Sequence, residues 1–86
     1  MYNIVVSRSA EKDLEKLPSQ IVKRVGKAID ELEITPKPPG SKKLKATSEN
    51  LWRIRVGDYR IIYNIDDNIY VVDIRKVGHR KDIYKK

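Results

Sequence analysis

The sequence contains no cysteine, which excludes a disulfide framework and a thiolate metal site and fits a reducing compartment. It has no apolar run near the ~20 residues that a membrane-spanning helix needs, and its first residues lack the features of a secretory signal. It shows no internal repeat, phosphate-binding glycine loop or metal-ligand spacing. We therefore expect one small domain over residues 1–86, located in the cytoplasm, with no membrane segment, cofactor or metal.

Basic residues are abundant and unevenly placed. The formal net charge is +7, with a pI of about 9.7. Residues 1–40 hold seven basic and six acidic side chains, whereas residues 41–86 hold twelve and six. A basic excess is often only a solvated surface, but its concentration in one half favours a polyanionic partner such as nucleic acid.

The first half of the chain reads as one strand and two helices. A β-branched run at residues 2–6 predicts the strand, and Ser7 or Ser9 can cap the helix that follows. Pro18 ends that helix, and Ser19 is a candidate cap for the second one. Both helices have one apolar face. The positions at helical spacing are Ala10, Leu14 and Leu17 in the first helix and Val22, Val25, Ile29 and Leu32 in the second.

The second half reads as sheet. The proline-rich segment 36–40 ends the second helix, and the basic segment Ser41 to Thr47 can be a short edge strand or a loop. Two β-branched and aromatic runs, 51–56 and 59–65, flank Gly57-Asp58, which is the pattern of a tight β-hairpin.

The hairpin pattern gathers three arginines. A two-residue loop sets Val56 opposite Tyr59 and Arg55 opposite Arg60, with Arg53 opposite Ile62. Since directly paired residues share a face, Arg53, Arg55 and Arg60 lie on one side of the sheet, here called the arginine face. The apolar residues lie on the other side, here called the helix face: Trp52, Ile54, Val56, Tyr59, Ile61 and Tyr63. Three guanidinium groups that repel one another suggest an anion-binding site.

A last strand is predicted at residues 69–75. With a loop at Asp67-Asn68, Ile65 pairs with Tyr70, which sets apolar side chains against one another. That register also places Asp73 and Arg75 on the arginine face, with Arg75 opposite Arg60. Trp52, Tyr63 and Tyr70 are expected in the core. The predicted fold class is α+β, with element order β-α-α-β-β-β: a small, mostly antiparallel sheet, one face covered by a helical hairpin and the arginine face left open.

These motifs resemble the RelE/ParE superfamily of type II toxin–antitoxin toxins. The resemblance covers nearly the whole chain, from the first strand and helical hairpin through Lys43-Leu44-Lys45 to the 51–63 hairpin. The closing segment, Val77-Gly78-His79-Arg80-Lys81-Asp82-Ile83-Tyr84, is more similar to the RelE branch. RelE-type toxins are endoribonucleases that cut messenger RNA in the ribosomal A site, whereas ParE-type toxins share the fold and poison DNA gyrase.

The resemblance also implies site residues. Arg60 corresponds to the sheet arginine of the family and Arg80 to its second catalytic arginine, while Tyr84 matches the terminal tyrosine. Arg53 and Arg55 stand where RelE relatives often have lysines. Because arginine stays protonated, it is a poor general base, and a base must come from elsewhere or the cluster acts mainly by electrostatics.

Several of these residues have a plainer alternative role. His79, the only histidine, is either the general base or an exposed tail residue. Arg80 can instead bind an antitoxin, and Tyr84 can anchor the tail to the core. The remaining basic residues are candidate RNA-phosphate contacts or a solvated surface: Lys42, Lys43, Lys45, Arg75 and Lys81.

The resemblance thus implies a ribosome-dependent messenger RNA endoribonuclease that inhibits translation without a metal. A cognate RelB-like antitoxin would neutralise it, and operator DNA would be bound only through the toxin–antitoxin complex. The alternatives are a gyrase inhibitor without nuclease activity and a non-catalytic nucleic-acid-binding module.

Overall fold

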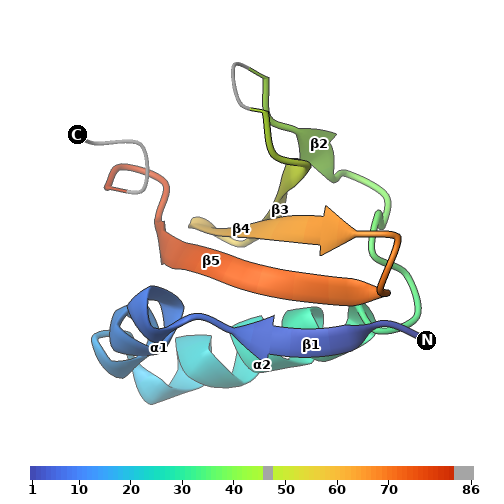
Figure 1. The fold of residues 1–86 in the computed structure, drawn as a ribbon. Helices are drawn as coiled ribbons and strands as arrows, with labels where there is room; N and C mark the ends of the chain where they lie inside the picture. The colour runs from blue at the N-terminus through green and yellow to red at the C-terminus, as the bar shows by residue number, and fades with distance from the viewer. Residues whose placement is uncertain (46–47, 83–86) are drawn as a thin grey trace.

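The computed structural model describes residues 1–45 and 48–82. It contains a five-stranded mixed sheet with both helices on one side (Figure 1). The strand order is β1-β5-β4-β3-β2, with β1 parallel to β5 and every other pair antiparallel. This confirms the predicted α+β class. The elements are β1 (Asn3–Val6), α1 (Arg8–Glu15), α2 (Ser19–Glu31), β2 (Lys42–Lys43), β3 (Leu51–Val56), β4 (Tyr59–Asp66) and β5 (Val71–His79).

The helix boundaries follow from capping and from proline. The Ser7 hydroxyl accepts a hydrogen bond from the Ala10 N–H at 3.1 Å, which makes Ser7 the cap of α1. The predicted cap at Ser19 is wrong, because Ser19 is the first residue of α2 and Pro18 stands at the cap position without a side-chain hydrogen bond. The buried residues of α2 and its C-terminal cap are Val25, Ile29 and Leu32, as their spacing predicted.

The β3–β4 hairpin has the predicted register. Arg53 pairs with Ile62, and Arg55 with Arg60. The turn needs Gly57, whose φ of +59° is in the left-handed region. A Cβ at Gly57 would also lie only 3.3 Å from a guanidinium nitrogen of Arg24 on α2. Local turn chemistry is therefore enough to define this hairpin.

The β4–β5 hairpin differs from its prediction by two residues. Ile65 pairs with Val72 rather than Tyr70, and the loop contains four residues, 67–70. The Asp66 carboxylate accepts from the Asn68 N–H at 2.9 Å and so stabilises this longer turn. Because a shift of two leaves every side chain on the same face, the apolar pattern could not distinguish the two registers.

A bulge in β5 changes the pairing again. Ile62 pairs with Lys76 while Tyr63 pairs with Ile74, so Arg75 is an extra residue. The predicted pairing of Arg75 with Arg60 is wrong, because Arg60 pairs with Gly78. Arg75 and Lys76 consequently both project from the arginine face.

Contacts with α1 and its cap accompany the bulge. The Asp13 carboxylate accepts from the Val77 N–H at 3.0 Å, and the Ser7 N–H donates to the Ile74 carbonyl. These bonds satisfy backbone groups of β5 next to and beyond the point where β1 ends. The bulge thus depends on tertiary contacts between distant segments.

The core lies between the helices and the helix face. Tyr63 is fully buried, its hydroxyl donates to the Pro36 carbonyl at 2.7 Å, and burial raises its pKa to about 12. Tyr70, predicted in the core, is 57% exposed and lies in the β4–β5 loop with a φ of +55°. Trp52 is partly buried and packs against the core.

The arginine face is only partly open. Arg53 is 6% exposed and Ile62 is 9% exposed, so the expectation of a uniformly open face is wrong. Neither helix in the described ranges is long and apolar enough to cross a membrane.

Candidate functional site

Two rows of residues cross the arginine face from strand to strand. One row runs Lys42, Arg53, Ile62 and Lys76, on β2, β3, β4 and β5. The other runs Arg55, Arg60 and Gly78. Since neighbouring strands lie about 4.8 Å apart, the sheet holds five basic side chains within a short distance of one another.

Arg53 is the least exposed of these cations. Its Nη1 atom is buried and has no hydrogen-bond partner in the part of the chain that the structure describes. A buried donor without an acceptor costs about 1–3 kcal/mol, and more when the group is charged. Lys42, directly opposite on β2, adds like-charge repulsion. An anionic oxygen beside Arg53 would relieve both effects.

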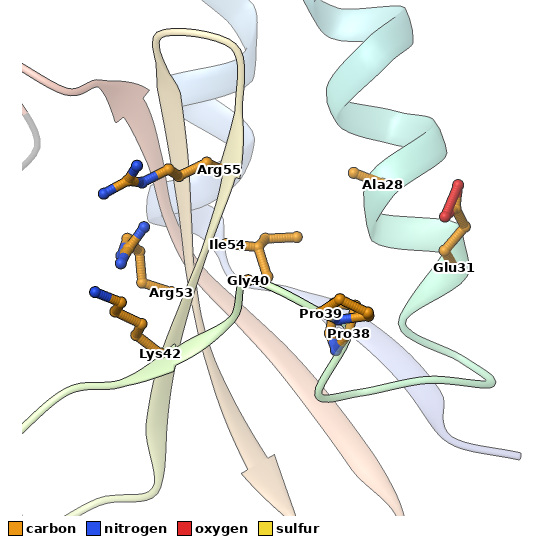
Figure 2. Close-up of a pocket in the computed structure, with 9 residues that line it drawn as sticks. All are labelled: Ala28, Glu31, Pro38, Pro39, Gly40, Lys42, Arg53, Ile54 and Arg55. Carbon is orange, nitrogen blue, oxygen red and sulfur yellow. The ribbon is translucent and has the colours of Figure 1, made fainter.

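A pocket of about 400 Å³ lies beside Arg53 at the edge of β3. Figure 2 shows Lys42, Arg53 and Arg55 on one side of β3 and Ile54 on the other, toward Ala28. The pocket therefore joins a cationic wall to an apolar one. Its lining residues are Ala28, Glu31, Pro38, Pro39, Gly40, Lys42, Arg53, Ile54 and Arg55.

Arg55 and Arg60 are paired across the hairpin, as predicted. Arg55 is exposed. Arg60 is half-buried, and its Nη1 donates to the carbonyls of Tyr59 at 3.2 Å and Gly57 at 3.4 Å. These contacts hold the Arg60 guanidinium near the turn, at one end of the arginine face.

Arg75 lies on the same face but has carboxylate partners. Its Nε donates to Asp73 at 2.6 Å, and its two terminal nitrogens bind Glu49 at 2.8 and 3.1 Å. The hydrogen bond from Arg75 lowers the pKa of Glu49, and Glu49 and then Asp73 raise the pKa of Arg75. The RNA contact predicted for Arg75 would have to compete with these two anions.

His79 is separated from the arginine face. It pairs with Tyr59, and the two rings meet edge to face with centroids 5.4 Å apart. Its Nδ1 accepts from the Lys81 N–H at 3.1 Å. The structure therefore places His79 on the helix face, where His79 and Asp13 both line a pocket.

The other predicted residues are scattered. Lys43 pairs with Trp52, so it lies on the helix face, and Lys45 is exposed beyond β2. Arg80 and Lys81 are exposed just after β5, with Arg80 Nε 4.0 Å from the Asp58 carboxylate. Tyr84 lies outside the described residues.

Lys76 is the residue of the arginine face that sequence analysis missed. The signal was a break in alternation: two consecutive basic residues, Arg75 and Lys76, stand between the buried Ile74 and Val77. Such a pair between two core residues indicates a bulge. As for metals, residues 1–45 and 48–82 contain no group of three or more acidic or histidine side chains able to hold an ion.

Comparisons with known proteins agree with this fold. The family model that describes the ParE toxin of the type II toxin–antitoxin system parDE matches residues 4–84. Toxin RelG of Mycobacterium tuberculosis is 36% identical over 86 residues, which span 99% of this chain and 98% of that toxin.

Solved structures of toxin–antitoxin complexes also match this fold. A chain of the archaeal RelE–RelB complex from Pyrococcus horikoshii superposes with a TM-score of 0.82 at 32% identity, covering 94% of this chain and 97% of that one. A chain of the RelBE2 toxin–antitoxin complex of Mycobacterium tuberculosis gives 0.81 at 32% identity, covering 92% and 98%. The chain therefore belongs to the RelE/ParE family of type II toxin–antitoxin toxins, as its strand and hairpin motifs predicted.

Proposed function

We propose that this protein is a toxin that cleaves messenger RNA at the ribosome without a metal ion, and that a RelB-like antitoxin neutralises it. The observation that carries the proposal is the buried Arg53 Nη1, which lacks an acceptor among the described residues and lies in a row of cations. A phosphate oxygen is the acceptor that fits such a group, because guanidinium donors match phosphate in geometry and charge.

The reaction we propose is attack by the ribose 2′-oxygen on the adjacent phosphorus, while a base or solvent water takes the proton of the 2′-hydroxyl. The bond from phosphorus to the 5′-oxygen breaks and that oxygen takes up a proton, which leaves a 2′,3′-cyclic phosphate and a 5′-hydroxyl. Arg53, Arg55 and Arg60 would stabilise the negative charge that builds on the phosphorane oxygens. By resemblance to the family, Arg80 is a further candidate contact to the phosphate, and Tyr84 is a candidate acid for the leaving oxygen or a platform for a base. In-line alignment of the RNA would come from binding.

Primer extension on messenger RNA from ribosomes incubated with the purified protein tests the proposal. The wild type should produce discrete cuts, and Arg60→Ala should slow them by ~10²–10³, the usual effect of losing one transition-state charge contact. Lys23→Ala is a matched control, since Lys23 is exposed on α2. Unchanged cleavage by Arg60→Ala would contradict the site.

The two alternatives for His79 predict different effects of His79→Gln on cleavage. If His79 is the general base, the variant should slow the chemical step by ~10²–10⁴. The position of His79 on the helix face at the end of β5, away from the arginines, favours a residue without a catalytic role, and His79→Gln should then keep the wild-type rate.

The antitoxin would use the apolar side of the pocket. The RelE chains of Pyrococcus horikoshii and Mycobacterium tuberculosis that this fold matches were crystallised in complexes with RelB. Ala28, Pro38 and Ile54 offer apolar surface beside the arginine face, and acidic antitoxin residues would meet the cations. A complex that dissociates by ~0.5 M salt would show that charge alone holds it.

Inhibition of DNA gyrase is the second candidate, since the matching family model describes the ParE toxin of parDE. A gyrase inhibitor has no need for an unsatisfied cation beneath an RNA phosphate. Gyrase inhibition by the purified protein, together with no cleavage on ribosomes, would replace the nuclease proposal.

A further inference from the structure

The bulge in β5 adds a cation to the arginine face that the RNA site does not yet include. Ile74 and Val77 are buried in the core, so the two residues between them, Arg75 and Lys76, both face away from the helices. Lys76 is exposed and pairs with Ile62, whose other neighbour is Arg53. Lys76 thus completes the row that begins at Lys42.

The two bulge residues differ in their partners. Arg75 is bound by Asp73 and by both oxygens of Glu49. Lys76 forms no ion pair with any residue in 1–45 or 48–82. One bulge residue is therefore neutralised within the fold, while its neighbour keeps a positive charge available in solvent.

We infer that Lys76 binds an RNA phosphate next to the one held by Arg53. The inference rests on the proposed function and adds a residue to its site. Lys76 lies two strands from Arg53, about 10 Å at the ordinary strand spacing, with only the apolar Ile62 between them. An RNA strand that crosses β3, β4 and β5 would meet Arg53 first and Lys76 next. Because a lysine donates from a mobile point charge, Lys76 is a positioning contact rather than a catalytic residue.

Salt-dependent binding of single-stranded RNA tests the inference. The RNA is an oligonucleotide with 2′-O-methyl groups throughout, so it cannot be cleaved, and binding is followed by fluorescence anisotropy from low to moderate salt. The logarithm of the binding constant falls with the logarithm of salt concentration by about 0.7 for each phosphate contact to a single strand. Lys76→Ala should reduce the magnitude of that slope by about 0.7, and Lys76→Arg should restore it.

Two matched variants control for charge and position. Arg75→Ala removes the neighbouring cation together with its ion pairs, and Lys23→Ala removes an exposed lysine from α2. Both should keep the wild-type slope. A wild-type slope for Lys76→Ala, a reduced slope for Arg75→Ala, or no measurable binding of the oligonucleotide by the wild type would overturn the inference.

Cleavage on ribosomes separates this inference from the proposed function. If the wild type cleaves and Lys76→Ala cleaves at the rate of Lys23→Ala at every salt concentration, the inference fails and the nuclease proposal stands. If the wild type does not cleave but Lys76→Ala still lowers the anisotropy slope, the nuclease proposal fails and the phosphate contact stands. We expect Lys76→Ala to raise KM relative to the wild type, most at low salt, because the contact that the variant loses is itself weakened as salt rises.

Discussion

Arg53 and Arg75 lie on the same face of one sheet, yet their surroundings are opposite. Arg53 is buried, faces Lys42, and has a guanidinium nitrogen without a partner among the described residues. Arg75 is partly exposed and bound by Asp73 and Glu49. A cation whose charge is balanced within the fold contributes to structure. A buried cation without a balancing charge destabilises the fold and therefore indicates a site for an anionic ligand. Charge alone does not tell these two roles apart.

Replacing Arg53 gives the largest expected effect. Arg53→Met keeps an unbranched apolar stem and removes the charge, so ribosome-dependent cleavage should fall by ~10²–10³. The same variant should raise the free energy of unfolding by about 1–2 kcal/mol, because no donor is left unsatisfied. Primer extension and urea unfolding measure the two quantities. A loss of both activity and stability would make Arg53 a structural residue.

Anion binding should stabilise the wild type through Arg53. Inorganic phosphate at ten times its Kd would add about 1.4 kcal/mol, and Tm would rise by roughly 4–8 °C for each kcal/mol. Arg53→Met should lose most of that rise, and Arg75→Met should retain it. Thermal unfolding at constant ionic strength, with chloride in place of phosphate, supplies the control. Equal shifts in all three proteins would assign the effect to general screening.

Arg75→Met should change stability slightly and cleavage by no more than a few-fold. The lost ion pairs are partly exposed, so the destabilisation should shrink as salt rises. Unfolding curves at low and high salt, compared with those of Arg53→Met, measure the difference. A large, salt-independent loss of cleavage in Arg75→Met would break the distinction between the two arginines.

The smallest expected effect is on the stability of the fold at low pH. Arg75 lowers the pKa of Glu49, so this carboxyl contributes stability above its unfolded pKa, and that contribution is lost as pH falls through the lower folded value. Glu49→Gln should therefore flatten part of the decline in stability between neutral pH and about pH 3. Arg53→Met should leave the acid limb unchanged. An acid limb identical in Glu49→Gln and wild type would remove the Glu49–Arg75 pair as a source of stability.

Sequence reasoning succeeded where structure is local. The Gly57-Asp58 turn defines the β3–β4 register within a few residues, so the arginine face could be predicted by counting. The β4–β5 register could not, because a shift of two preserves the apolar alternation. The bulge could not be predicted by counting either, since it is accompanied by hydrogen bonds with Ser7 and Asp13, more than sixty residues away.

The site was predicted in part for the same reasons. Arg53, Arg55 and Arg60 come together because one hairpin holds them. His79 lies beyond the bulge, which sets it opposite Tyr59 on the helix face. The burial of Arg53 and the neutralisation of Arg75 depend on chain segments that meet only in the folded protein, and the roles of all these residues stay predictions.

The bulge also gives β5 one residue more than its ladder with β4 requires. Deletion of Arg75 would leave Ile74 opposite Tyr63 and Lys76 opposite Ile62, with both halves of the strand paired as before. Deletion of a single residue of β5 outside the Arg75–Lys76 pair would turn part of the strand to the wrong face. Changes of length in this strand are therefore tolerated at the bulge, and a homologue one residue shorter there can keep the same hydrogen-bonded sheet and the same row of cations.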